Sequence, residues 1–306
     1  MTMREVIDVV EGAFRERGAG RVEMPPKIGV HTSAGGYFHA MPAYIPALHA
    51  VGVKWVSVYQ DNQRRDLPRV AGLLVLNDEE TGLPLVVMDG AWVTAMRTGA
   101  ATAVAARYLA NPESAVLGVL GCGIQGRSNL EALREVVPLR HVVAYDVHPD
   151  RAAQFVAEVA SRWGLSVVQA AEPREAVEAS DVVVTAGRIV RPPHATIKAG
   201  WLRAGAFASL VDYDAYWDRA AMHETSKFCT DDLGQLEHYR ARGYLQDIPP
   251  IYATLGELVC GTKPGRQDRH ERTMICNLGL ALADIATGLL VYRRAVESGR
   301  GIWLSA

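Results

Sequence analysis

The sequence predicts an α/β fold, in which a doubly wound parallel sheet is inserted into a second, discontinuous α+β domain. Three observations lead to this prediction. A glycine-rich turn at 121–126 joins an apolar run to a helical pattern. Strand and helix patterns alternate from 115 to about 212. An apolar stretch at 273–295 has the length of a long helix, and we expect it to return the chain to its first domain.

Composition and charge place the chain among ordinary globular proteins. Its 306 residues suffice for about two domains, with 49% hydrophobic and 22% charged residues. The formal net charge of −2 gives no electrostatic argument for nucleic acid or an anionic membrane as a partner. No apolar run is long enough to span a bilayer, and the N-terminal MTMREVIDVVEGAFRERG has the pattern of an amphipathic helix rather than a signal peptide.

The cysteines show no metal-binding or redox motif. None forms a C-x-x-C pair, and no cluster of His and Cys has zinc spacing. We therefore expect reduced thiols in a cytoplasmic protein without a metal site. The four cysteines are Cys122, Cys229, Cys260 and Cys276.

The first 110 residues or so do not alternate strand and helix in a regular way. A helix at 3–17 precedes a loop-and-strand region rich in Gly and Pro. Three strand-like runs follow, and the NDEETG segment between the last two has the composition of a hairpin turn. A helix with many small residues, which indicate close packing, ends before Asn111-Pro112. The strands are expected at 51–59, 69–76 and 83–89, and this helix at 91–109.

The glycine turn carries the most information about function. In AVLGVLGCGIQG, an apolar run leads directly into Gly121, Gly123 and Gly126, which have G-x-G-x-x-G spacing, and a helical pattern follows. The first glycine permits a tight turn, the second lets the backbone approach a diphosphate, and the third lets the helix pack close to the strand. The segment therefore predicts the Rossmann type of dinucleotide site, with the phosphates at the helix N-terminus.

An acidic residue supports this interpretation. Asp146 ends the next apolar run and lies 25 positions after Gly121, near the spacing expected for a residue that binds the adenosine ribose. An aspartate there favours NAD, because its charge repels the 2′-phosphate of NADP; the nearby Arg151 would soften this preference, so NADP stays possible. The alternative is a structural glycine turn with an unrelated surface aspartate.

The alternating pattern defines the predicted domains. Further strands are expected at 166–169, 181–185 and 206–211, helices at 126–136 and 150–163, and a loop at 263–267. Such alternation indicates a parallel sheet with right-handed crossovers. We expect a nucleotide-binding domain at 113–270 and a discontinuous second domain at 1–112 plus 271–306.

Polar residues that end strands or interrupt apolar segments are candidates for chemistry, because ligands of doubly wound folds bind beyond the carboxyl ends of the strands. Asp212 ends one run, and Thr185 and Ala186 end another, where small residues leave room for a ligand. Lys54 interrupts an apolar strand and Arg97 a helix of small residues.

These residues also have purely structural interpretations. A lysine in an apolar strand also occurs where the side chain reaches water from a sheet edge. Arg97 would serve equally as the partner of a core ion pair, and Asp212 as a helix N-cap. A further basic residue, Lys27, follows two prolines.

Several segments together resemble the ornithine cyclodeaminase/μ-crystallin family over nearly the whole chain. They are MPAYIPALHAVGVKWVSVYQDN, MDGAWVTAMRTGAATAVAARYLA, GVLGCGIQGRSNLEAL, GELVCGTKPGR and TMICNLGLALADIATG. The resemblance implies that both termini build a substrate-binding and dimerisation domain around an inserted Rossmann domain. It also implies a homodimer that pairs through the first domain's sheet. The activities it implies share hydride transfer between a nicotinamide and the carbon of an amine or imine.

The resemblance also implies roles for individual residues. Lys54 corresponds to the family's active-site lysine, Arg97 to its carboxylate-binding arginine, Lys27 to a second basic substrate residue and Asp212 to its catalytic aspartate. The residues expected to contact the cofactor are Gly121, Gly123, Ile124, Gln125, Gly126, Asp146, Thr185, Ala186, Ser209 and Asn277.

The sequence departs from the cyclodeaminase pattern at the substrate end. Cyclodeaminases carry a G-x-D-x-P-G-K type of segment where this chain reads SLVDYDAYWD, so that Tyr216 replaces the lysine and a second acid, Asp214, is added. The C-terminal T-x-F-x-S type of segment is also changed, to TMICN. These changes weaken the case for ornithine as the substrate but leave carboxylate recognition and hydride transfer intact.

The sequence therefore favours an NAD(P)-dependent oxidoreductase that acts on C–N bonds, either an amino-acid dehydrogenase or an imine/ketimine reductase. Its substrate would be a small amino acid, keto acid or imine. The alternative is an ornithine or lysine cyclodeaminase, an ammonia lyase that uses NAD catalytically. A third interpretation is a non-catalytic binding protein like μ-crystallin.

Overall fold

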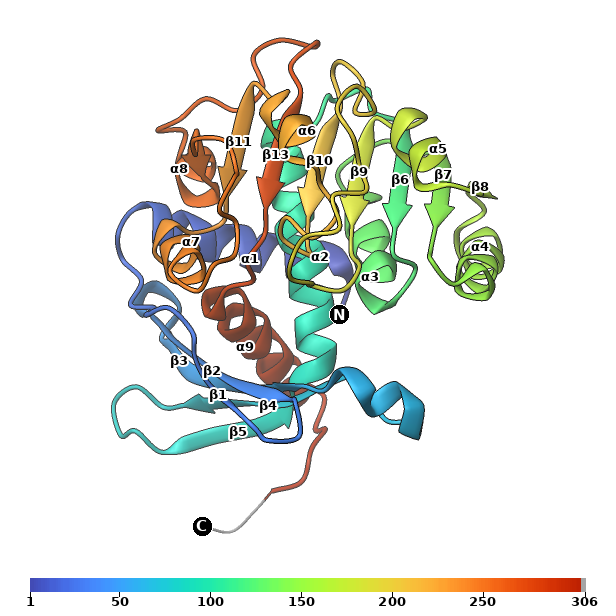
Figure 1. The fold of residues 1–306 in the computed structure, drawn as a ribbon. Coiled ribbons are helices and arrows are strands. Elements are labelled where there is room, and N and C mark those ends of the chain that lie inside the picture. Colours follow the sequence, from blue (N-terminus) through green and yellow to red (C-terminus); the bar gives the residue numbers. More distant parts are fainter. Residues whose placement is uncertain (304–306) are drawn as a thin grey trace. The chain divides into compact units, whose positions relative to one another are not determined.

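The computed structural model describes residues 1–303, which form two compact units (Figure 1). Among these residues, the first unit comprises Met1–Arg97 and 280–303, and the second comprises Thr98–Gly279. The first boundary lies within helix α2 (Gly90–Leu109), so this helix belongs to both units. The sequence instead placed the two boundaries at 112/113 and 270/271.

The first unit is built on an antiparallel sheet in the order β1-β2-β3-β4-β5. Its strands are β1 (Ile28–His31), β2 (Tyr37–Ile45), β3 (Ala50–Val58), β4 (Val70–Asn77) and β5 (Pro84–Asp89), and its helices are α1 (Met3–Gly18), the 3-10 helices η1 (Pro46–Leu48) and η2 (Gln60–Arg65), and α9 (Ala281–Glu297). The three strands expected at 51–59, 69–76 and 83–89 and the hairpin turn between the last two are confirmed.

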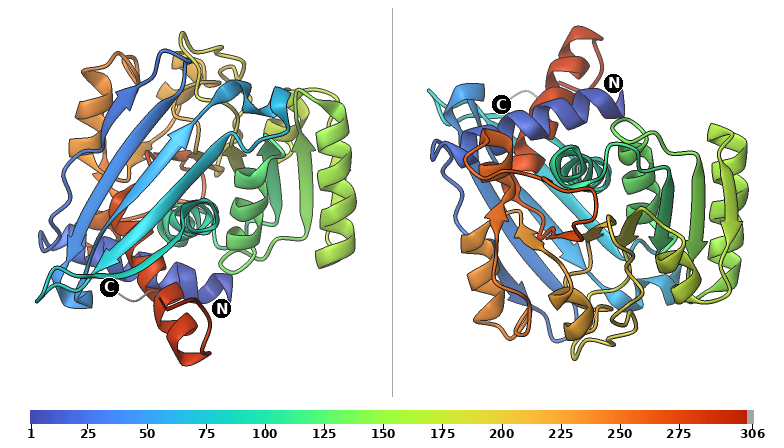
Figure 2. Two further views of the ribbon diagram at one scale, coloured as in Figure 1. Left: turned by 90° about the horizontal axis from the view of Figure 1, so that it is seen from below. Right: turned by 90° about the horizontal axis from the view of Figure 1, so that it is seen from above.

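Helix α9 packs against one face of this sheet, as Figure 2 shows, and α1 packs on α9. The strands alternate: Leu74 and Leu76 of β4 point to the buried face. Two glycines permit close packing there. A Cβ atom on Gly52 would lie 2.2 Å from the Val75 carbonyl oxygen, and one on Gly288 would lie 2.1 Å from a methyl carbon of Leu74. The buried face of the sheet and α9 form the core of this unit.

The second unit is built on a parallel sheet in the order β12-β11-β13-β10-β9-β6-β7-β8 (Figure 1). Its strands are β6 (Val116–Leu120), β7 (His141–Tyr145), β8 (Ser166–Gln169), β9 (Val182–Thr185), β10 (Phe207–Leu210), β11 (Lys227–Thr230), β12 (Ala253–Thr254) and β13 (Thr273–Cys276). Its helices are α3 (Ile124–Leu133), α4 (Pro149–Trp163), α5 (Pro173–Glu178), α6 (Arg219–His223), α7 (Leu233–Arg240) and α8 (Leu255–Cys260), in addition to the end of α2. The predicted doubly wound fold, combined with an α+β unit, is confirmed.

The strand order changes direction between β6 and β9. The chain proceeds from β6 through β7 to β8 on one side, and it then returns to β9 and β10 on the other. Such a switch point, at the carboxyl ends of the strands, is where ligands of doubly wound sheets bind.

The prediction of one continuous helix over 273–295 is wrong. The chain first forms strand β13 at Thr273–Cys276, and α9 begins only at Ala281. TMIC is a short apolar run, and periodicity alone does not separate a buried strand from a buried helical segment. Here β10 and β11 pair with the TMIC segment on either side. Gly279, at φ +77°, has a non-helical backbone conformation, so that α9 begins only after it.

Candidate functional site

The three glycines of the turn between β6 and α3 differ in what surrounds them. Gly121 has φ +106°, and a Cβ atom on it would lie 2.6 Å from the Ala186 carbonyl oxygen. A Cβ atom on Gly126 would lie 2.3 Å from the Gly121 carbonyl oxygen, so α3 packs directly on the turn. A Cβ atom on Gly123 would meet nothing within 4 Å. The backbone at Gly123 is therefore open to approach by a ligand.

The N-terminus of α3 presents backbone donors beside this open position. Gly123 is the N-cap and has no side chain with which to bond the first amides of the helix. Ile124, the first helical residue, is 62% exposed. The Gln125 carbonyl oxygen accepts a hydrogen bond from Asn129 Nδ2 at 2.8 Å, which braces the first turn. Amides at a helix N-terminus, together with the helix dipole, bind anions such as a diphosphate.

Asp146 follows β7 and is tied to the glycine turn. Its Oδ2 accepts from the Cys122 amide at 2.9 Å, and its Oδ1 accepts from the His148 amide at 2.9 Å. Each carboxylate oxygen has further acceptor capacity, so the arrangement suits the hydroxyls of a ribose. Burial, and then the charge of Asp146, raises the pKa of the Cys122 thiol to about 12, so this cysteine stays a neutral thiol at physiological pH.

Ser209 and Asn277 lie together with a residue that the sequence analysis missed. Asn277 Nδ2 donates to Ser209 Oγ at 2.9 Å, and Ser209 Oγ shares a 2.9 Å hydrogen bond with Thr102 Oγ1. Asn277 Oδ1 is buried and has no hydrogen-bond partner within residues 1–303, so the cluster retains an acceptor for a donor on a ligand. Thr102 stands in a helix of small residues, a pattern that indicated only close packing.

Asp212 is buried just beyond β10 and accepts hydrogen bonds from two groups at the end of β9. Its Oδ1 accepts from Thr185 Oγ1 at 2.6 Å, and its Oδ2 accepts from the Gly187 amide at 2.8 Å. The suggested N-cap role is wrong, because turns rather than a helix follow Asp212. Burial raises the pKa of Asp212 to about 7, although the hydrogen bonds from Thr185 and Gly187 lower it. Asp212 is therefore able to exchange a proton near neutral pH.

In the first unit, Lys54 and Arg97 share one carboxylate oxygen. Lys54 Nζ donates to Asp284 Oδ1 at 2.6 Å and to Thr94 Oγ1 at 3.0 Å, and Arg97 Nε donates to the same Asp284 Oδ1 at 2.8 Å. The three charged residues are buried, with 1%, 6% and 0% exposure for Lys54, Arg97 and Asp284. Lys54 therefore does not reach water from a sheet edge, while the ion-pair interpretation of Arg97 is correct.

Burial lowers the pKa of Lys54 to about 8, Asp284 opposes this shift, and Arg97 adds to it. An amine with such a pKa exchanges protons readily near neutral pH. Lys27 is also buried and immediately precedes β1. Asp284 was missed by the sequence analysis, although an acid inside the apolar segment ALADIATG is a signal for a paired buried charge.

The family model for the ornithine cyclodeaminase/mu-crystallin family matches residues 1–299. The chain belongs to this family. An alanine dehydrogenase of Archaeoglobus fulgidus is 35% identical over 310 residues, which cover 98% of this chain and 93% of that protein. The predicted family is thus confirmed.

Two solved structures of relatives match nearly the whole chain. One is the Δ1-pyrroline-2-carboxylate reductase of Thermococcus litoralis in complex with NADH and L-proline, with a TM-score of 0.91, 34% identity, and coverage of 99% of this chain and 96% of that one. The other is an archaeal alanine dehydrogenase dimer with bound NAD, with a TM-score of 0.89, 34% identity, and coverage of 100% and 95%.

Two residues of the SLVDYDAYWD segment depart from the cyclodeaminase pattern, Tyr216 and Asp214, and they lie in different surroundings. Tyr216 packs against Gly187, where a Cβ atom would lie 2.5 Å from the tyrosine ring, and Tyr216 Oη accepts from the Arg188 amide at 3.1 Å. Tyr216 thus adjoins the residue that binds Asp212. Asp214 instead lines a separate cavity of about 350 Å³.

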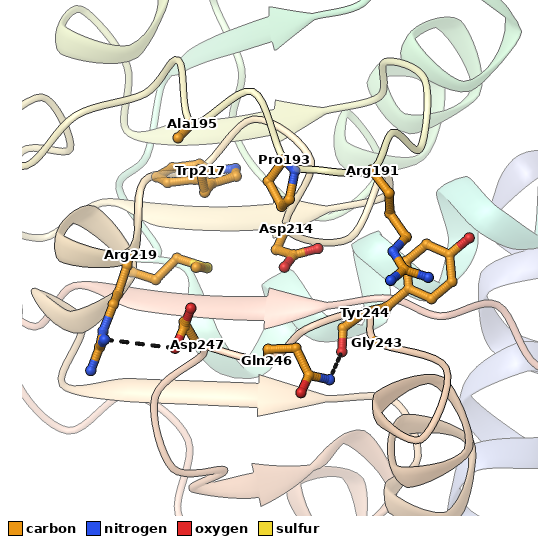
Figure 3. A pocket seen from close by; sticks show the side chains of 11 residues that line it. Arg191, Pro193, Ala195, Asp214, Trp217, Arg219, Gly243, Tyr244, Gln246 and Asp247 are labelled. Carbon is orange, nitrogen blue, oxygen red and sulfur yellow. Dashed lines mark hydrogen bonds and ion pairs between the residues drawn. The ribbon is translucent and has the colours of Figure 1, made fainter.

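Figure 3 shows this cavity with Asp214 and Trp217 on its wall. Its other charged groups are largely occupied with protein partners. The Arg191 guanidinium stacks on the Tyr244 ring at 4.6 Å and donates to a backbone carbonyl, and Arg219 pairs with Asp247 at 3.6 Å. Burial raises the pKa of Asp214.

Two kinds of feature are absent from residues 1–303. No helix in that range is long and apolar enough to cross a membrane. Within the same range, no group of three or more His, Cys, Asp and Glu residues is arranged to hold a metal ion. The four cysteines are free thiols.

Proposed function

We propose that this protein is an NAD-dependent oxidoreductase that acts on the C–N bond of a small α-amino acid or of the corresponding imine. The observation that carries the proposal is the buried pair of Lys54 and Arg97 on one oxygen of Asp284. A proton-exchanging amine beside a guanidinium suits a substrate in which the reacting C–N carbon also bears a carboxylate. The relatives named above, alanine dehydrogenase and Δ1-pyrroline-2-carboxylate reductase, support this class of reaction.

The residues present fit a nicotinamide dinucleotide. Gly123 and the N-terminal amides of α3, with Ile124 and Gln125, would hold the diphosphate, and Asp146 the adenosine ribose. Gly121 and Gly126 shape this turn. The acid at 146 favours NAD over NADP.

Groups at the ends of β9, β10 and β13 would complete the cofactor site. Thr185, Ala186 and Ser209 lie at these carboxyl ends, and Asn277 offers its unpartnered Oδ1 to a donor such as a carboxamide N–H. The cofactor, when bound, supplies or accepts the hydride.

The protein's own side chains would bind the substrate and move protons. Arg97 donates to Asp284 through Nε, and the two terminal nitrogens, which form the fork that grips a carboxylate, take no part in that bond. Lys27 would add positive charge for the same carboxylate. In the reductive direction the imine carbon gains a hydride and the nitrogen a proton, which Lys54 Nζ would supply. Asp212, with its pKa near 7, would act as a second acid–base group.

The protein would work as a homodimer. Trp55 of β3 and Leu73 of β4 are directly paired on the sheet face opposite α9 and are 43% and 52% exposed. Phe38 stacks on Trp55, with 5.3 Å between the ring centroids. An exposed apolar sheet face of this kind indicates an interface, and a second copy is the occupant we propose, since the archaeal relative is a dimer.

The free thiols of this protein suit a cytoplasmic location.

The experiment is a substrate scan with purified protein, followed by absorbance at 340 nm. We expect NADH oxidation with Δ1-pyrroline-2-carboxylate or with pyruvate plus ammonia, and NAD reduction with L-proline or L-alanine. Release of ammonia from L-ornithine without net NADH would instead identify a cyclodeaminase. If none of these carboxylates changes the absorbance, the proposal fails.

A further inference from the structure

We propose that Asp284 is the positioning residue of the site, which holds the Lys54 amine and the Arg97 guanidinium in one geometry. This inference rests on the proposed function, because it assigns roles to Lys54 and Arg97 in substrate chemistry. Neither the sequence pattern nor the resemblance had assigned a role to Asp284.

The three residues come from three separate elements. Lys54 lies on the buried face of β3, Arg97 on α2 and Asp284 on α9. Asp284 Oδ1 lies 2.6 Å from Lys54 Nζ and 2.8 Å from Arg97 Nε, so one oxygen fixes both basic groups. Thr94 Oγ1, which donates to the Gly90 carbonyl oxygen at 2.6 Å, therefore accepts the second hydrogen bond from Lys54.

Charge explains why this acid is required. Two buried cations near one another repel, and an anion between them offsets both that repulsion and part of their desolvation. The charged groups that face Lys54 are Asp284 and Arg97, while its neighbours on β2 and β4 are the apolar Met41 and Leu74. With both bases protonated the cluster carries a net charge of +1, which attracts a substrate carboxylate.

A geometric consequence concerns Arg97. The bond from Nε to Asp284 sets the orientation of the guanidinium plane, and it does not use the two terminal nitrogens. In a variant without Asp284, the substrate carboxylate would meet a less ordered Arg97 guanidinium. The loss of Asp284 should therefore raise KM, and it should also move the pH at which Lys54 titrates.

The test compares wild type with Asp284→Asn in the NADH-dependent reduction of Δ1-pyrroline-2-carboxylate between pH 6 and 10. Without the negative charge, the pH limb that reports Lys54 should move down by about 1–3 pH units, and KM should rise about tenfold. Asp181→Asn is the matched control. Asp181 Oδ2 accepts from the Ala115 and Val116 amides, at 2.8 and 2.9 Å, and belongs to the other compact unit. Asp181→Asn should not change the pH of the limb that reports Lys54.

A second variant keeps the inference testable if Asp284→Asn folds poorly. Asp284→Glu keeps the charge but displaces it by one methylene, so it should raise KM with the limb unmoved. The inference is overturned if Asp284→Asn lowers kcat without moving the limb, or if Asp284→Glu leaves KM unchanged.

If the wild type reduces no substrate, the proposed function fails, and thermal unfolding then tests Asp284 separately. The difference in Tm between wild type and Asp284→Asn should vary between pH 7 and 10 only while Lys54 is present. The inference is overturned if the Tm difference varies with pH to the same extent in a Lys54→Met background.

Discussion

Thr185 donates its hydroxyl hydrogen to Asp212 over 2.6 Å and thereby joins the ends of the neighbouring strands β9 and β10. The Trp217 indole donates to the same threonine oxygen at 3.2 Å. The buried carboxyl group is thus held in one orientation at the carboxyl edge of the parallel sheet. A fixed orientation suits a carboxyl group that has to donate a proton to a ligand at one position.

Asp212→Asn is expected to lower kcat about 100-fold or more, because the variant has no titrating group there. The pH profile of kcat should lose the limb near 7 that belongs to Asp212. NADH binding, followed by fluorescence, should change little. Unchanged kcat would remove Asp212 from the proposed acid–base chemistry.

The same variant tests the effect of burial on stability. The pKa of Asp212 is raised from 3.8 to about 7, so between these values the folded state keeps a proton that the unfolded state has lost. The free energy of unfolding of the wild type should therefore fall as pH rises from about 4 to 7. Relative to wild type, Asp212→Asn should gain on the order of 4 kcal/mol over this range, as measured by urea unfolding. A constant difference would contradict the raised pKa.

Arg97→Lys is expected to raise KM for the carboxylate substrate about 10–100-fold, because lysine keeps the charge but loses the two-pronged fork. Lysine is preferred to alanine here, since alanine would leave Asp284 with one buried cation fewer. The Kd for NADH should not change. A KM equal to that of the wild type would show that another group binds the carboxylate.

Two glycines of the turn should respond differently to the same substitution. Gly126→Ala places a Cβ atom 2.3 Å from a backbone carbonyl, so both Tm and NADH affinity should fall. Gly123→Ala meets nothing within 4 Å in the protein, so Tm should hold while NADH affinity falls at least about tenfold, because the methyl group blocks the diphosphate. Gly12→Ala, in α1 and equally free of contacts, serves as the control. Normal NADH affinity in Gly123→Ala would contradict the cofactor site.

The apolar sheet face gives a prediction about assembly. Leu73→Lys places a charge among exposed apolar side chains, so sedimentation should show a monomer where the wild type is a dimer. Ile302→Lys, at a position that is 91% exposed outside the sheet, should remain dimeric. A wild-type monomer, or a dimer that tolerates Leu73→Lys, would exclude this face.

The sequence predicted the features that depend on local pattern. The glycine spacing, Asp146 and the β-α alternation led to the parallel sheet and the Gly turn, because each is a pattern that is visible in the order of residues along the chain. The segment at 273–295 was misjudged because pairing with β10 and β11, which are distant in sequence, decides that TMIC is a strand.

The acid of the Lys54 cluster was missed for a related reason. Asp284 lies 230 positions from Lys54 and 187 from Arg97, so only the folded unit brings it to them. Thr102 likewise reaches Ser209 across 107 positions. Residue types along the chain identified which groups were chemically capable, but not their partners.

The transfer of deuterium from NADH labelled at C4 of the nicotinamide tests the central claim most directly. After reduction of Δ1-pyrroline-2-carboxylate, or of pyruvate plus ammonia, mass spectrometry of the amino acid locates the label. The account predicts one deuterium on the carbon that bears both nitrogen and carboxylate, from only one of the two C4 positions. An amino-acid product formed without that deuterium from either position would contradict it.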